Sequence, residues 1–100
     1  MSRSKRYRAS WNATVLAETD DVVVVEGNVY FPSDAIAAEH LRITNGRSLC
    51  FWKGLASYYD VVVGGTVNPG AAWYYPHPSP LARRVKGRVA FWQGVRVEGM

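Results

Sequence analysis

The segment ASYYDVVVGGTV, residues 56–67, contains the clearest structural pattern in this chain. Two runs of β-branched and aromatic residues flank Gly64 and Gly65. Paired glycines suit a two-residue turn whose backbone takes positive φ angles, and the flanking residues favour extended backbone. The segment therefore predicts two antiparallel strands joined by a tight turn.

A second pair of strands is expected in the N-terminal part of the chain. Residues 13–18 and 22–26 are rich in β-branched residues, and residues 19–21 lie between them as a turn. Four consecutive valines, 22–25, are typical of a strand that is buried on both faces or that crosses a barrel wall. We therefore expect this strand to lie at the centre of a sheet.

The remaining strands are expected to be short and separated by turn residues. They are residues 29–31, a strand entering at Leu49 after a loop at residues 44–48, residues 71–75, residues 88–92 and residues 95–98. The last two would be joined by a turn at Gln93 and Gly94. The chain thus alternates strands and turns over nearly its whole length.

Helical segments are expected at only two places. Ser33 is a suitable N-cap for a helix from Asp34 to about His40. Ser79 and Pro80 favour a helical turn that ends at Gly87. The expected fold class is therefore mainly β: a single small antiparallel barrel or two-sheet sandwich with one or two short helices.

Length and charge predict one domain with a basic extension. The chain has 100 residues, of which 48% are hydrophobic, enough for one compact core. Four of its 12 basic residues lie in the first eight positions, and the rest of the chain is close to neutral. We expect a flexible basic tail over residues 1–10 and a β-rich domain over residues 11–100. Nucleic-acid binding is not expected, because the positive charge belongs mainly to this tail.

Cysteine and histidine content limits the chemistry. A single cysteine, Cys50, cannot form an internal disulfide, and one cysteine with two histidines provides too few ligands for a structural zinc site. The sequence has no apolar run of the length that spans a bilayer and no apolar signal-peptide centre. We therefore expect a cytoplasmic protein without membrane association, metal or cofactor, and the sequence leaves its oligomeric state open.

Residues 50–60, CFWKGLASYYD, gather aromatic side chains around Lys53. Strand alternation would place Cys50 and Trp52 on one face and Lys53 on the other, with Gly54 marking a bulge or the close approach of a ligand. One interpretation is a packed core along which Lys53 extends to solvent. The other is a cleft, because several tyrosine hydroxyls are difficult to satisfy in a dry core but suit the wall of a cavity.

Four segments in this order and spacing resemble the family called domain of unknown function 427. They are VVVEGNVYFP, CFWKGLASYYDV, AAWYYPHP and VKGRVAF, within a pattern that runs from about Trp11 to Val97. The resemblance implies a single small β-rich domain and no established reaction. Its motifs, together with the cleft hypothesis, give these candidate ligand-binding residues: Glu26, Tyr30, Cys50, Trp52, Lys53, Tyr58, Tyr59, Trp73 and Tyr75.

The family also carries a nucleotidyltransferase-like name, which the residues do not support. Nucleotidyl transfer needs two or three carboxylates on one side of a site to hold magnesium against phosphates. Asp20 and Asp21 are adjacent and would point apart, and no glycine-rich phosphate loop precedes a helix. We therefore do not expect this reaction.

Three functional hypotheses remain. The leading one is binding of a small anionic or planar molecule in an aromatic cleft around Lys53, to which Glu26 would pair as a counter-ion. The second is an enzyme in which Lys53 is a nucleophile or electrostatic stabiliser and a tyrosine is the acid or base. The third is a module that binds a partner protein through exposed aromatic residues. The sequence assigns no catalytic residue.

Overall fold

A computed structural model describes residues 5–100 as a mainly β structure with three short 3-10 segments. The strands are β1 (Tyr7–Trp11), β2 (Thr14–Thr19), β3 (Val23–Val25), β4 (Asn28–Pro32), β5 (Leu41–Cys50), β6 (Gly54–Val63), β7 (Thr66–Tyr74), β8 (Arg88–Phe91) and β9 (Arg96–Gly99). The 3-10 segments are η1 (Ser33–Ala35), η2 (Ala38–His40) and η3 (Pro80–Val85).

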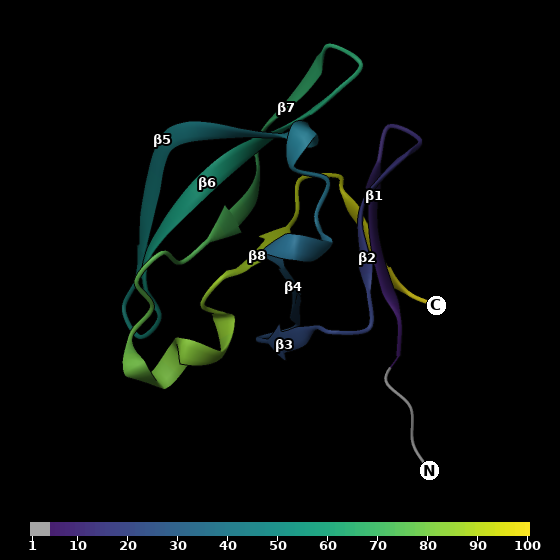
Figure 1. The fold of residues 1–100 in the computed structure, drawn as a ribbon. Helices are drawn as coiled ribbons and strands as arrows, with labels where there is room; N and C mark the ends of the chain where they lie inside the picture. The colour runs from purple at the N-terminus through teal and green to yellow at the C-terminus, as the bar shows by residue number, and fades with distance from the viewer. Residues whose placement is uncertain (1–4) are drawn as a thin grey trace.

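The strands form two antiparallel sheets (Figure 1). The smaller sheet has the order β2-β1-β9, and the larger has the order β3-β4-β8-β7-β6-β5. The larger sheet is not closed, so the fold is a two-sheet sandwich and not a barrel. This confirms the expected mainly β class.

The hairpin predicted from residues 56–67 is confirmed. Strands β6 and β7 pair antiparallel with Val63 opposite Thr66, and Gly64 and Gly65 form the turn with φ angles of 56° and 80°. Positive φ at both turn positions is the geometry that glycine adopts without steric cost. Strand β7 is longer than expected, because it continues through Gly70 to Tyr74 instead of ending and restarting.

The predicted pairing of residues 13–18 with residues 22–26 is wrong. Strand β2 pairs with β1, whereas β3 pairs with β4 across a turn at Glu26 and Gly27. The valine-rich strand β3 has three residues and lies at one edge of the larger sheet, so its expected central position is also wrong. Strand β9 likewise pairs with β1 and not with β8, although the turn at Gln93 and Gly94 is present.

Residues 33–50 differ from the expected helix and loop. The helix predicted from Asp34 to His40 is wrong, because the chain forms two separate 3-10 turns, η1 and η2, with extended backbone at Ile36 and Ala37. The sheet is entered at Leu41 and not at Leu49, and the expected loop is a bulge within β5. The helical turn predicted at Pro80 is present as η3, with Ser79 as its N-cap.

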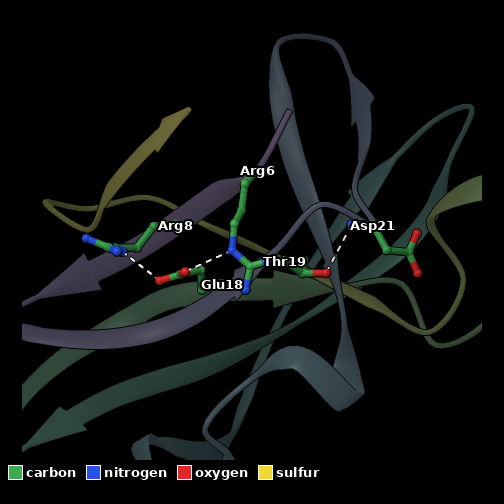
Figure 2. Close-up of polar contacts among 5 residues, drawn as sticks. All are labelled: Arg6, Arg8, Glu18, Thr19 and Asp21. Atoms are coloured by element: carbon green, nitrogen blue, oxygen red, sulfur yellow. Dashed lines mark hydrogen bonds and ion pairs between the residues drawn. The ribbon is translucent and has the colours of Figure 1, made fainter. Parts of the chain in front are cut away.

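Residues 7–10 do not belong to a flexible tail, which corrects that part of the prediction. They form β1, and the basic side chains Arg6 and Arg8 both bind the carboxylate of Glu18 on β2, at 2.9 and 2.8 Å (Figure 2). These two ion pairs link β1 to its neighbour and hold the pKa of Glu18 below its usual value. Residues 1–4 of the predicted tail lie outside the described residues.

The larger sheet has a core on each of its two faces. Successive residues of a strand point to opposite faces, so adjacent positions such as Tyr30 and Phe31 enter different cores. Phe31 belongs to the core between the two sheets, with Leu16 of β2. Tyr30 and Trp73 belong to the second core, which η3 contributes to through Val85. The aromatic residues of the second core therefore lie on the face turned away from the smaller sheet.

No helix within residues 5–100 has the length and apolar character needed to cross a bilayer.

Candidate functional site

The turn between β5 and β6, residues 51–53, is held against the loop that precedes η3. The backbone N–H of Ser79 donates to the carbonyl of Lys53 at 2.9 Å, and the Ser79 hydroxyl donates to the carbonyl of Trp52. Gly54 follows with a φ of +113°, and a Cβ there would lie 3.3 Å from the carbonyl oxygen of His77. The group that closely approaches Gly54 is thus the chain's own backbone and not the predicted ligand, and this contact fixes the direction in which the turn presents Lys53.

The Lys53 side chain is buried in the second core. Only 5% of Lys53 is exposed, and its ammonium pairs with the carboxylate of Glu26. The ammonium also lies 4.6 Å from the centre of the Trp52 ring and 5.8 Å from that of Tyr75. Burial by itself would lower the pKa of this amine, but Glu26 and the Cys50 sulfur raise the pKa above its ordinary value. Lys53 is thus a buried cation, as the predicted pairing with Glu26 required.

Glu26 reaches Lys53 from the tight turn between β3 and β4. Glu26 and Gly27 have φ angles of 54° and 80°, so a non-glycine residue occupies a left-handed conformation at the tip of this turn. Its carboxylate accepts hydrogen bonds from Lys53 and from the indole N–H of Trp52, the latter at 3.3 Å. The Lys53 hydrogen bond in particular holds the pKa of Glu26 below its usual value. The ion pair therefore joins the two hairpin turns.

A cavity of about 220 Å³ lies beside this ion pair. Its lining consists of aromatic rings with one amide and one ammonium group, from Asn28, Tyr30, Lys53, Tyr58, Trp73, Tyr75 and Trp92. Trp73 is at the centre of the aromatic wall, edge-to-face with Tyr30 at 6.2 Å and with Trp92 at 5.4 Å. Tyr58 stacks on Trp92 with ring centres 6.4 Å apart. The rings are thus held in place by one another.

Two phenols of this wall, those of Tyr30 and Tyr75, are neutral hydrogen-bonding groups. Burial raises the pKa of Tyr30, and burial together with Tyr30 raises the pKa of Tyr75 to about 12. The hydroxyl of Tyr30 accepts a hydrogen bond from the indole N–H of Trp73 at 3.3 Å, and the hydroxyls of Tyr58 and Ser48 share one at 2.7 Å. A neutral phenol both donates and accepts, so the wall offers polar atoms in an apolar setting.

The nine candidate residues fall into three groups. Those that line the cavity are Tyr30, Lys53, Tyr58, Trp73 and Tyr75. Glu26, Cys50 and Trp52 surround the Lys53 ammonium without lining the cavity. Tyr59 is on the opposite face of the sheet, where it stacks on Tyr74 with ring centres 4.7 Å apart. Its predicted place in the same cleft is wrong.

Two lining residues, Asn28 and Trp92, were missed by the sequence prediction. Asn28 precedes the strand expected at residues 29–31, but in the structure it begins β4, directly after the turn at Glu26 and Gly27. Trp92 follows the end of β8 and returns to the sheet through its indole N–H, which donates to the carbonyl of Gly70 at 2.6 Å. Strand alternation could have identified Trp92, because residues 90 and 92 of an extended chain point to the same face. Ala90 is in the same core as Trp73, so Trp92 would be expected on the side of the aromatic wall.

The sulfur of Cys50 lies in a positive environment next to Lys53. Burial raises the pKa of this thiol, but the backbone N–H groups of Trp52 and Lys53 and the Lys53 ammonium lower it, and the pKa falls below its usual value. Alkylation by iodoacetamide measured against pH should therefore have its midpoint below that of a free cysteine. In Lys53→Met the midpoint should rise, and in the control Arg83→Gln it should stay unchanged. An unchanged midpoint in Lys53→Met would show that the ammonium does not act on the sulfur.

The chain belongs to the family described as Domain of unknown function (DUF427), whose pattern it matches over residues 1–100. The comparison with curated proteins gave no match. Family membership agrees with a small β domain and adds no reaction. The described residues 5–100 contain no group of three or more histidine, cysteine, aspartate or glutamate side chains arranged to hold a metal ion.

Proposed function

We propose that this protein binds a small planar molecule in the cavity between the aromatic wall and Lys53. The observation that carries the proposal is a buried ammonium beside an open cavity whose other walls are mainly aromatic rings. A cation is costly to bury, and proteins rarely place one in an aromatic core unless it pairs or binds. Aromatic walls with a few fixed polar groups are typical of small-molecule sites.

The ion pair with Glu26 favours a planar ligand over a highly charged one. An ammonium has three N–H donors, and Glu26 takes one of them while offsetting its charge. The site is then close to neutral, so ring stacking contributes more to binding than net charge does. A ligand acceptor atom, neutral or singly anionic, would receive a further Lys53 hydrogen bond.

The size of the cavity limits the ligand to one or two rings. A cavity of about 150 Å³ is large enough for benzene. The present cavity of about 220 Å³ is somewhat larger and is not closed off from solvent. Pyrimidines, purines and pterins have the right size, flat faces and ring acceptor atoms.

Binding is favoured over a reaction with Lys53 as nucleophile. A nucleophilic lysine must lose its proton, which requires a lowered pKa. The pKa of Lys53 is raised, because Glu26 and Cys50 stabilise the charged form. The amine is therefore a hydrogen-bond donor at neutral pH.

A thermal-shift and fluorescence screen with pyrimidines, purines and pterins tests the proposal. A ligand present at about 100 times its Kd should raise the unfolding midpoint by about 10 °C or more. Stacking should also quench the tryptophan fluorescence, because Trp73 and Trp92 line the cavity. In Lys53→Met both effects should be smaller at the same ligand concentration for every compound that binds the wild-type protein, because the aromatic wall remains but the Lys53 hydrogen bond is lost.

The control is Arg83→Gln, which removes an exposed cation that does not line the cavity. It should bind as the wild-type protein does, and circular dichroism should show that both variants are folded. Compounds that bind Lys53→Met as tightly as wild-type protein would refute the proposed site. A wild-type protein that binds no compound in the panel would refute the proposed ligand class.

A further inference from the structure

A second cavity, of about 280 Å³, lies on the opposite face of the larger sheet from the aromatic wall. It is formed where the end of β7 approaches the turn between η3 and β8. This region carries the basic residues Arg83, Arg84, Lys86 and Arg88, which the proposed function does not use. Tyr75 lines both cavities, but Lys53 and Glu26, whose ion pair lies beside the first cavity, do not line this one.

The walls of the second cavity are flat and mainly apolar. Tyr59 and Tyr74 stack nearly parallel, with an interplanar angle of 21°, and Pro76 and Val89 add apolar surface. Burial, and then Tyr74, raises the pKa of Tyr59, so its phenol is neutral at physiological pH. Such walls suit a flat hydrophobic ring.

The charged groups that line this cavity are both positive. Arg88 is held in place by Asp21, whose backbone carbonyl and carboxylate each accept a guanidinium hydrogen bond at 3.0 Å. Its side chain is only 18% exposed, so the position of this cation is fixed. Lys86 is exposed, and none of the ion pairs found within residues 5–100 includes it. Asp21 offsets the charge of Arg88, which leaves the ammonium of Lys86 for a ligand.

We propose that this second cavity binds a flat organic anion with a single negative charge, of the aromatic carboxylate class. The ring lies against the apolar walls, and the carboxylate lies at the rim, where it pairs with Lys86. The proposal divides the basic run in two: Lys86 and Arg88 line the cavity, whereas Arg83 and Arg84 are exposed and do not. A partly exposed ion pair adds selectivity for the anion but only modest affinity.

Titration of the full-length, ¹⁵N-labelled protein with 2-naphthoate at low salt tests this inference. The backbone amide signals of Lys86, Gly87 and Val89 should shift together and saturate. Lys86→Gln should raise the Kd about fivefold, which corresponds to the loss of one partly exposed ion pair. The uncharged analogue 2-naphthamide should bind the wild-type protein weakly, with a Kd raised by a similar factor.

The matched control is the double variant with Arg83→Gln and Arg84→Gln, which lowers the local positive charge but keeps the cavity lining. Its Kd should equal that of the wild-type protein. An equal loss of affinity in this variant and in Lys86→Gln would show non-specific attraction to a basic surface and would overturn the proposal. Shifts centred on Tyr58 and Trp92 would place the probe in the first cavity and would also overturn it, as would the absence of saturable shifts.

Discussion

Gly54→Ala should lower the free energy of unfolding by about 2–4 kcal/mol, because two costs combine at this position. The backbone of Gly54 has a φ of +113°, which residues with a Cβ rarely adopt. The added methyl group would also meet the carbonyl of His77 at 3.3 Å and the backbone of Pro78 and Ser79 at 3.7 Å. These atoms belong to the loop that holds the turn carrying Lys53, so relaxation would move the candidate site.

Urea denaturation of Gly54→Ala and Gly65→Ala separates these two costs. Gly65 also has a positive φ, +80°, but a Cβ there would have no atom within 4 Å. Gly65→Ala should therefore cost only about 1 kcal/mol, from backbone strain alone. If the two variants lost equal stability, the close approach of the His77 carbonyl would have no energetic effect. In Gly54→Ala the hydrogen bond from Ser79 to the Lys53 carbonyl should also weaken, which amide hydrogen exchange at Ser79 would show as faster exchange.

Local turn patterns predicted the β6-β7 hairpin but not the other strand pairings or the sheet order. Gly64 and Gly65 specify their turn by backbone conformation alone, so the β6-β7 hairpin follows from a few adjacent residues. The partner of β2 is β1, and β1 lies in a segment whose basic residues suggested disorder. Its order depends on ion pairs with Glu18 and on pairing with β9, which is distant in the sequence. Such contacts leave no local pattern.

Strand alternation explains why the positions of some aromatic side chains were predicted correctly and that of Tyr59 was not. Tyr58 and Tyr59 are adjacent in β6, so they must point to opposite faces, and placing both in one cleft contradicted that rule. Tyr30, Tyr58 and Trp73 were correctly grouped and share the second core. Trp73 and Tyr58 are also direct partners across β6 and β7.

The burial of Lys53 could not be predicted from alternation, because residues 51–53 are a turn and not a strand. The turn directs Lys53 inward and leaves Phe51 95% exposed, the reverse of what hydrophobicity alone suggests. Two long-range contacts decide this arrangement: the Ser79 hydrogen bonds to the turn and the pairing with Glu26. The pairing of Lys53 with Glu26 was predicted from the sequence. The hydrogen bonds from Ser79 to the turn could be identified only in the folded structure.

Tyr30→Ala should lower the free energy of unfolding by about 3–5 kcal/mol, the largest loss expected for a residue of the candidate site. Tyr30 is 1% exposed and is among the largest fully buried side chains. Its ring packs edge-to-face on Trp73, so removing it deletes buried aromatic surface and enlarges the cavity beside Lys53. For a domain of this size, with about 5–15 kcal/mol of total stability, this is a large fraction.

Tyr30→Phe is the matched variant, because it keeps the ring and removes only the hydroxyl that accepts the Trp73 hydrogen bond. It should cost about 1 kcal/mol, since the indole N–H loses one partner beside a cavity that water can enter. Urea denaturation followed by tryptophan fluorescence measures both variants, and native Tyr30→Ala should show red-shifted emission as Trp73 becomes hydrated. Equal losses in the two variants would mean that the hydroxyl and not the ring stabilises this core. A loss below about 1.5 kcal/mol for Tyr30→Ala would mean that the aromatic wall collapses onto the vacated space, and the cavity would then not persist as a rigid site.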